Sequence, residues 1–240
     1  MTRTATATLA ATLCLSAGLT VPATAVAVGG GTQAPAAGTG GATPDQAVLG
    51  AGSLRAGRAA LLGRRQRIAG ALDGAGPGRE VILQRSDRSA GWVTIARTQT
   101  RAGGAFGAVW RADRVGRFIL RALPTAEGGS ASASVSPTTR MTVYAPAIAT
   151  HFGPGWYGTR TACRTILTVS TIGVAHRTLP CGTLVEFIYR GRTLRAPVVD
   201  RGPYANNADW DLTLAASRAL GFNGKDYVGA IRVGRVSLKR

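Results

Sequence analysis

The sequence predicts an all-β protein with two domains, a β-sandwich followed by a small closed barrel. Between residues 48 and 144, short apolar patches recur about every ten residues and are separated by turns rich in Gly, Pro, Ser and Asp. From residue 145 onward, the pattern gives mostly strands and one short helix over about 95 residues, which is typical of a small barrel.

The first residues have the pattern of a cleaved secretory signal, which we assign to residues 1–27. Arg3 supplies a positive start, residues 9–21 are mostly apolar, and small residues follow. The apolar run is short and interrupted by Thr and Ser, which argues against a membrane span. Leu13 precedes Cys14 where a lipoprotein signal needs a small residue. We therefore expect a secreted protein, extracellular or associated with the cell wall, without a lipid anchor.

Residues 28–47 consist mainly of Gly, Ala, Thr and Pro and are expected to form a flexible linker. The sandwich is then expected over residues 48–144, with strands at 66–72, 80–84, 91–96, 105–110, 117–122 and 140–144. The run from Gly91-Trp92 to Gly116-Arg117-Phe118 resembles the immunoglobulin-like modules of exported bacterial proteins. Its acidic residues lie mainly in predicted turns, with no histidine nearby. A wall-binding or spacing module and a sandwich without a ligand both remain open.

The charge of the chain is strongly positive, with 29 Lys and Arg against 11 Asp and Glu, a net charge of +18. Such a balance suits polyanionic partners, including nucleic acid, anionic lipid or a cell wall with carboxylates and phosphates. The arginines are scattered, and helix-turn-helix, zinc-finger and RNA-binding aromatic patterns are missing from the sequence, so we do not expect nucleic acid as a partner. The two histidines and the cysteines have no metal-ligand spacing. We expect a monomer that needs no cofactor and is attracted to anionic wall polymers.

Removal of the signal leaves two cysteines, Cys163 and Cys181. An even pair in an exported chain is most simply one disulfide. A free catalytic thiol, with His176 as its partner, is the alternative.

The second domain is expected over residues 145–240. Its strands are predicted at 147–152, 184–189, 193–199 and 230–236. A short helix is predicted from Asp211 to Arg218, and Gly221 would end it.

Four segments of this domain carry a chemical signal: residues 150–163, residues 173–183 with His-Arg-Thr-Leu-Pro, residues 199–204 with Asp-Arg-Gly-Pro, and residues 211–221 with Asp-Leu. In this order they resemble the rare lipoprotein A (RlpA-like) family of double-psi β-barrels, over about residues 147–236. That family includes septal-ring lytic transglycosylases and is related in fold to expansins and to one group of β-glucan hydrolases. The resemblance implies a six-stranded double-psi barrel that acts on peptidoglycan glycan strands.

The residues themselves fit this chemistry. Asp200 ends an apolar strand and precedes an Arg-Gly-Pro turn, which places a carboxyl at the barrel rim. Partial desolvation raises the pKa of such a carboxyl and favours a proton donor, whereas Arg201 acts in the opposite direction. Glycosidic cleavage needs an acid for the leaving oxygen. A lytic transglycosylase needs no attacking water, because the C6 hydroxyl of the sugar attacks and leaves a 1,6-anhydro end.

The resemblance implies a catalytic role for three residues. Asp200 is expected to be the acid and base, and His176 its partner or a substrate-orienting group. Asp211 matches the position of the catalytic acid in the expansin-related hydrolases. Two structural alternatives remain: His176 could order its turn through hydrogen bonds, and Asp211 could cap the helix that follows it.

Further residues are candidates for substrate binding. Trp156, Tyr157 and Tyr204 could form a floor on which sugar rings stack, or could belong to the core. Arg201 could pair with Asp200 or with a carboxylate of a peptide stem. A Cys163–Cys181 bridge belongs to one branch of these barrels and would hold the loop that carries His176.

We therefore expect a secreted peptidoglycan lytic transglycosylase. The main alternative is a non-catalytic wall-binding or wall-loosening module, as expansins are. Two further hypotheses stay open: a glycoside hydrolase that uses Asp200 with Asp211, and a protein-interaction or inhibitor barrel.

Overall fold

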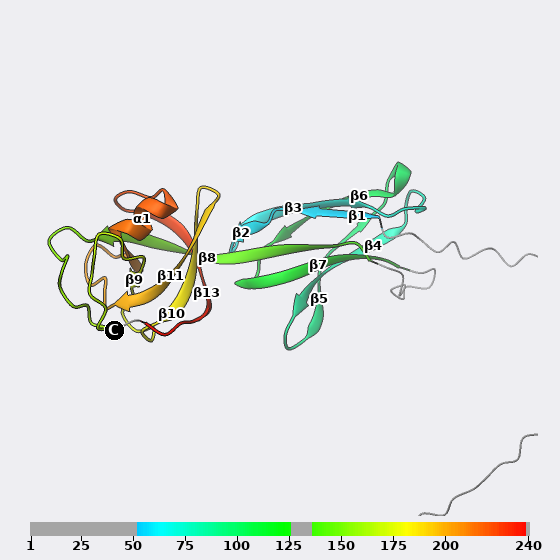
Figure 1. Ribbon diagram of the computed structural model, residues 1–240. Coiled ribbons are helices and arrows are strands. Elements are labelled where there is room, and N and C mark those ends of the chain that lie inside the picture. Colours follow the sequence, from blue (N-terminus) through cyan, green and yellow to red (C-terminus); the bar gives the residue numbers. More distant parts are fainter. Residues whose placement is uncertain (1–51, 126–135, 239–240) are drawn as a thin grey trace, which may run out of the picture. The chain divides into compact units, whose positions relative to one another are not determined.

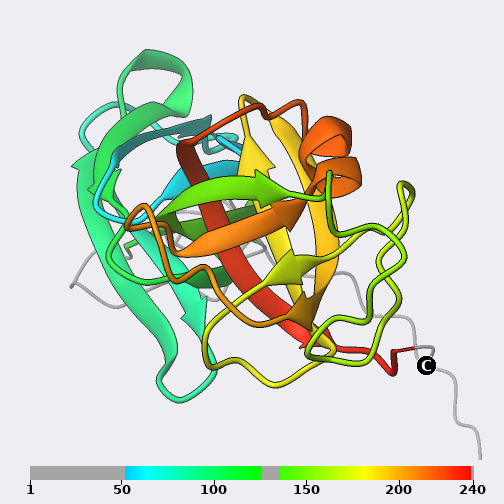
Figure 2. The same cartoon turned by 90° about the vertical axis from the view of Figure 1, so that its left-hand side faces the viewer.

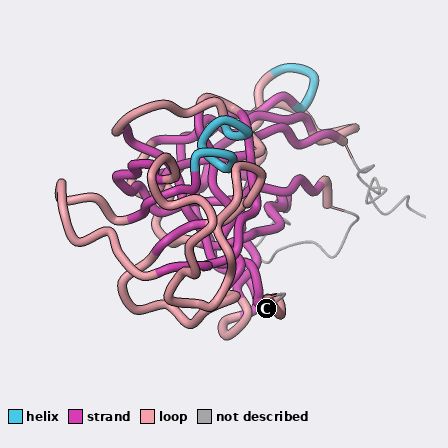
Figure 3. The backbone as a smooth tube through the Cα atoms, turned by 60° about the vertical axis from the view of Figure 1, so that its left-hand side comes forward, coloured by secondary structure: helices cyan, strands magenta, loops and turns pink. Residues whose placement is uncertain are grey.

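Strands dominate the structure, a computed structural model that describes residues 52–125 and 136–238. The predicted all-β class is confirmed: in the described residues α1 (Leu214–Leu220) is the only α-helix, accompanied by one 3-10 turn at Ala102–Gly104 (Figure 3). None of the helices in these ranges has the length and apolar character needed to cross a membrane. The predicted signal at 1–27 and linker at 28–47 lie outside the described residues.

The N-terminal region folds into two sheets. The first contains three antiparallel strands in the order β1 (Ser53–Ala56), β3 (Arg65–Ala71) and β6 (Ala105–Arg111). The second contains β5 (Gly91–Gln99), β4 (Glu80–Asp87), β7 (Gly116–Pro124) and the first half of β8 (Thr138–Phe152), which also pairs in parallel with β2 (Ala59–Leu61). One cluster of buried side chains draws on both sheets, including Ile68, Phe106 and Trp110 from the first and Leu83, Leu120 and Met141 from the second. The immunoglobulin-like assignment of this region stays a prediction.

Strand β8 belongs to both regions of the fold (Figure 1). Its residues Thr138–Val143 pair with β7, and from Ala145 onward it pairs with β13 (Asp226–Arg235). The domain boundary predicted at residues 144 and 145 therefore falls inside a continuous strand.

A buried carboxylate lies beside the middle of β8. Glu186 is 8% exposed, and its Oε1 accepts a hydrogen bond of 3.0 Å from the Tyr144 hydroxyl. Its Oε2 accepts from Arg117 at 2.8 Å and from Arg195 at 2.6 Å. Burial opposes ionisation of Glu186, but the bonds from Arg195, Tyr144 and Arg117 lower its pKa overall. Burial and the Glu186 bond raise the pKa of Tyr144 to about 12. Glu186 is thus fully engaged in a structural network, as expected for a carboxylate in the middle of a strand.

Six strands close the C-terminal barrel (Figure 2). Besides β8 and β13, they are β9 (Val174–Ala175), β10 (Thr183–Tyr189), β11 (Arg192–Asp200) and β12 (Trp210–Thr213). The order is β12-β9-β11-β10-β13-β8, and a pairing of β8 with β12 closes the circle. The pairs β8–β12 and β9–β11 are parallel, whereas the other pairs are antiparallel. Phe187, Val198 and Leu212 are completely buried inside the barrel. The predicted closed six-stranded barrel is confirmed.

The helix begins three residues later than predicted. Asp211 lies in β12, where Asp211, Leu212 and Thr213 pair with Thr150, His151 and Phe152 of β8. Thr213 is the N-cap, and its hydroxyl accepts a bond from the Ala216 amide at 3.3 Å. Closure of the barrel thus recruits the residues that the sequence pattern assigned to the first helical turn. The predicted C-terminal stop is correct, because Gly221 adopts the left-handed conformation with φ of 76°.

Candidate active site

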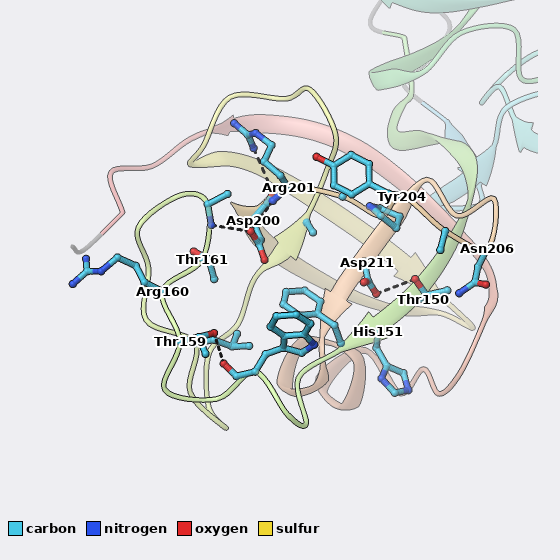
Figure 4. A pocket seen from close by; sticks show the side chains of 18 residues that line it. Thr150, His151, Thr159, Arg160, Thr161, Asp200, Arg201, Tyr204, Asn206 and Asp211 are labelled. Atoms are coloured by element: carbon cyan, nitrogen blue, oxygen red, sulfur yellow. Dashed lines mark hydrogen bonds between the residues drawn. The ribbon is translucent and has the colours of Figure 1, made fainter.

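A groove of about 560 Å³ opens at one rim of the barrel. Its lining comes from the end of β8, the loop over residues 156–167, Ala175 of β9, the loop that follows β11, and Asp211 of β12. Both predicted catalytic aspartates, Asp200 and Asp211, line this groove (Figure 4). The predicted binding residues Trp156, Arg201 and Tyr204 line it as well.

Asp200 ends strand β11, as the sequence predicted, and its carboxylate is held by the backbone. Its Oδ1 accepts hydrogen bonds from the Ala162 amide at 2.9 Å and from the Arg201 amide at 2.8 Å (Figure 4). The carbonyl oxygen of Asp200 accepts a bond of 3.2 Å from the His176 amide. These three backbone contacts fix the position of Asp200, and the two amides hold its carboxylate without help from a charged side chain of the described residues.

Asp211 has a different environment. Its Oδ1 accepts a hydrogen bond of 2.9 Å from the hydroxyl of Thr150, which lies directly opposite in the parallel pairing of β8 and β12. Burial raises the pKa of Asp211, and the charge of Asp200 raises it further. The Thr150 bond and nearby His151 act in the opposite direction, but the pKa stays above its ordinary value. Asp211 therefore has the environment of a proton donor.

The two carboxylates are related through strand β9. Ala175 is the register partner of Asp200 in β11 and of Asp211 in β12. Neighbouring strands lie about 4.8 Å apart, and the pairing of β9 with β11 shifts register between Val198 and Asp200. The Cα atoms of the two aspartates, each paired with Ala175, are therefore roughly 10 Å apart, and Asp200, Ala175 and Asp211 all line the groove. This arrangement places two carboxyl groups on the wall of one groove.

His176 does not line the groove. Its Nδ1 accepts hydrogen bonds from the amides of Thr178 at 3.2 Å and Leu179 at 3.1 Å, and its ring lies 4.4 Å from the ring of Trp210. Burial, together with the charges of arginines nearby, lowers the pKa of His176 and favours the neutral ring. These contacts match the alternative in which the histidine orders its turn, and its link to Asp200 runs through its backbone amide. A catalytic role for the His176 ring stays a prediction.

Cys163 and Cys181 form the disulfide that the cysteine count favoured. The guanidinium of Arg201 lies against it, with Nη1 3.7 Å from the Cys163 sulfur and Nη2 3.3 Å from the Cys181 sulfur. The Arg201 side chain makes no hydrogen bond to the Asp200 carboxylate and instead contacts the Asp200 carbonyl oxygen at 3.4 Å. The bridge therefore steadies both Arg201 and the Ala162 amide, which is adjacent to Cys163.

The three aromatic residues predicted to bind substrate differ in their placement. Trp156 is 62% exposed and Tyr204 is 78% exposed, and both lie on the lining of the groove. Tyr157 is half-buried and lies outside that lining. Its hydroxyl sits so close to Gly153 that a Cβ there would lie 2.8 Å from it. The Tyr157 hydroxyl thus packs against Gly153, whereas the rings of Trp156 and Tyr204 are exposed on the groove lining.

Sequence reasoning missed three contributors to this site. Thr150 bonds Asp211, the Ala162 amide bonds Asp200, and Trp210 supports the His176 ring. The Thr150 contact depends on the parallel register of two strands far apart in the chain, and the Ala162 contact on a backbone group of a loop. Neither leaves a residue pattern that could have predicted it. Within the described ranges, no group of three or more His, Cys, Asp or Glu side chains is arranged to hold a metal ion.

Comparisons with known proteins agree with the barrel and its groove. Residues 150–234 match the family model described as lytic transglycolase. A probable endolytic peptidoglycan transglycosylase RlpA of Synechocystis sp. is 37% identical over 78 residues, which are 32% of this chain and 24% of that protein. The protein of the same description from Aquifex aeolicus is 38% identical over 80 residues, 32% of this chain and 35% of that protein. The chain thus spans about a quarter to a third of the length of these curated relatives.

Among solved structures, the Streptomyces papain inhibitor is similar with 30% identity and a TM-score of 0.27, covering 36% of this chain and 92% of that protein. The family match, by contrast, extends from Thr150 through Gly234 and so includes both groove aspartates. Residues 150–234 thus match the lytic transglycolase family model and are similar to RlpA proteins, and they make up most of a closed six-stranded barrel that fits an RlpA-like double-psi β-barrel.

Proposed function

We propose that this protein is an exported peptidoglycan lytic transglycosylase that cleaves glycan strands and leaves 1,6-anhydro ends. The observation that carries the proposal is the pair of aspartates across β9 in the groove of an RlpA-like domain. Export rests on the secretory pattern of residues 1–27. The RlpA relatives, whose descriptions name peptidoglycan transglycosylases, support the substrate class.

The environments of the two aspartates suggest a division of roles. Asp211, whose pKa is raised by burial, is assigned as the general acid that donates a proton to the glycosidic oxygen as the bond from C1 to that oxygen breaks. The C6 hydroxyl oxygen then bonds to C1, and its proton returns to Asp211, so that the enzyme is restored without water. Asp200, fixed by two amides, faces the positive charge that develops on the sugar. The sequence-based expectation gave the acid and base role to Asp200, and our proposal gives it to Asp211, supported by its burial and by its bond from Thr150.

Binding of the glycan is assigned to the exposed aromatic residues of the groove. Trp156 and Tyr204 present apolar ring faces on which sugar rings can stack. The separation of roughly 10 Å between the Cα atoms of the aspartates leaves room for the reacting sugar between the two carboxyl groups. The same exposed rings also suit the alternative of an expansin-like module that binds the wall without cleaving it.

Mass spectrometry of peptidoglycan digested by the wild type, Asp211→Asn and Asp200→Asn tests the proposal. We expect anhydro-ended fragments from the wild type and at least about a hundredfold less from either variant. Asp73→Asn, the same chemical change in a turn distant from the groove in sequence, should behave as the wild type. Reducing-end fragments would move the assignment to a hydrolase. Retention on insoluble wall without release by any of the proteins would leave the non-catalytic module.

A further inference from the structure

On the outer face of the second N-terminal sheet, the guanidinium of Arg121 stacks on the ring of Trp92. This outer face consists of Trp92 and Thr94 of β5, Gln84 of β4, Ile119 and Arg121 of β7, and Arg140 of β8. The strand registers place these residues together, because Gln84 is opposite both Thr94 and Arg121, and Ile119 is opposite Arg140. Their sequence neighbours Leu83, Leu120 and Met141 point into the core instead. Figure 1 shows β5, β4 and β7 side by side.

Arg121 is held in one position on this face. Its guanidinium lies 3.8 Å from the centre of the Trp92 ring, and its Nε and Nη2 donate to Gln84 Oε1 at 2.9 Å and 2.7 Å. Gln84 Nε2 in turn contacts the Thr94 hydroxyl at 3.4 Å. Trp92 remains 37% exposed. The arginine fork and the ring are therefore arranged before any ligand arrives, which lowers the entropy lost on binding.

Arg121 has no acidic partner among the described residues. Burial lowers its pKa, and no carboxylate contributes to that shift. Two other arginines on the same strands are already neutralised, since Arg97 pairs with Glu80 at 3.0 Å and Arg117 pairs with Glu186 at 2.8 Å. A partly desolvated guanidinium without a counterion is costly unless an anion can join it.

We propose that the outer face binds a peptidoglycan strand, with a sugar ring on Trp92 and a stem-peptide carboxylate on Arg121. This inference rests on the proposed function, because it assigns a second site for the same polymer. The Nε–Nη2 edge of Arg121 is used by Gln84, and its Nη1 nitrogen has no partner among the described residues, which suits a single carboxylate beside a single ring on Trp92. Arg97 and Arg117 are paired with carboxylates, which leaves Arg121 and Arg140 as the outer-face arginines without an acidic partner among the described residues, whereas a dense phosphate polymer calls for a longer row of free cations. Two sites on one polymer raise the effective concentration of the strand at the groove.

The test is a pelleting assay of the full chain on insoluble peptidoglycan from which phosphate polymers have been removed. Asp200→Asn is included in every protein so that the polymer stays intact during the measurement. We expect Arg121→Gln and Trp92→Ala each to weaken binding about fivefold. Arg67→Gln removes the same charge from an exposed position on β3, in the other sheet, and should change binding by less than about twofold. Thermal unfolding checks Trp92→Ala for folding, and Arg121→Gln keeps the test valid if that variant is unstable.

Removal of the stem peptides supplies the second arm. On polymer without stem peptides, the protein that retains Arg121 should bind only as strongly as the Arg121→Gln variant. Binding of the Arg121→Gln variant itself should not change. Equal binding by Arg121→Gln and Arg67→Gln on polymer free of phosphate would overturn the inference, as would a loss seen only when phosphate polymers are present. If no anhydro ends are formed by the wild type while the Arg121 effect persists, the lytic function fails and this binding site stands.

Discussion

Replacing Cys163 and Cys181 together by alanine opens the loop that holds Asp200 from one side. The bridge joins residues with a sequence separation of 18. In the chain-entropy description, a crosslink closing a loop of that size restricts the unfolded chain by about 11 cal/mol/K, which corresponds to about 3 kcal/mol at room temperature. We expect the free energy of unfolding to fall by this amount.

The same change should also affect catalysis. Ala162 precedes Cys163 and donates its amide to Asp200, and Arg201 lies against both sulfurs. Loosening this loop removes an aligned hydrogen bond to a groove carboxylate, so we expect activity to fall about tenfold while the protein is still folded. Urea unfolding measures the first effect, and product release at a temperature below the transition measures the second.

Reduced and alkylated wild-type protein is a control for this prediction. Wild-type protein that has been reduced and alkylated should resemble the double variant in both measurements, because each lacks the same crosslink. A free energy of unfolding within about 0.5 kcal/mol of the wild type, together with unchanged activity, would refute the reasoning that links the bridge to the loop and to Asp200.

Four further predictions concern protonation and capping. Thr150→Val removes a bond that lowers the pKa of Asp211, so the decline of activity at high pH should move to higher pH in a pH–rate profile, whereas Thr150→Ser should keep the wild-type profile. Because a raised pKa makes the buried charge of Asp211 unfavourable as pH rises above its ordinary value, Asp211→Asn should unfold at a temperature equal to or above that of the wild type at pH 7, and clear destabilisation would contradict this. The pKa of Glu186 is lowered in the folded protein, so Glu186 stabilises the fold at pH values above the ordinary pKa of 4.5, and this stabilisation is lost as the pH falls below 4.5. Glu186→Gln should remove this pH dependence of the free energy of unfolding in urea titrations and should lower that free energy by about 1 kcal/mol at pH 7. Thr213→Ala removes the N-cap of α1 and should lower the free energy of unfolding by about 1 to 2 kcal/mol, and an unchanged value would show that the helix does not depend on it.

The sequence was informative where local chemistry decides the structure. Asp200 was predicted to end a strand because an apolar run stops there before an Arg-Gly-Pro turn, and β11 does end at Asp200. Gly221 was predicted to end the helix, and it takes the left-handed conformation that glycine allows at low cost. The alternating apolar residues around Phe106 likewise gave the position of β6 within a residue.

The sequence was less informative where distant segments decide the structure. Asp211 preceded a convincing helix and could have been its cap, but the parallel pairing with Thr150 draws it into β12 and into the groove. Whether a histidine in a loop faces a groove or its own turn depends on where the neighbouring strands run. The structure places the His176 ring on Trp210, which sequence spacing does not reveal. Nothing in the sequence indicated that one strand, β8, continues through the boundary predicted at residues 144 and 145 and serves both regions.

The most direct test of the central claim is digestion of peptidoglycan in water enriched in oxygen-18, followed by mass spectrometry of the released ends. Attack by the C6 hydroxyl, with Asp211 donating and recovering the proton, uses no water. The account therefore predicts anhydro ends without the heavy isotope, and loss of these products in Asp211→Asn. Fragments that carry one oxygen-18 at a reducing end would show that water is the nucleophile and would contradict the account.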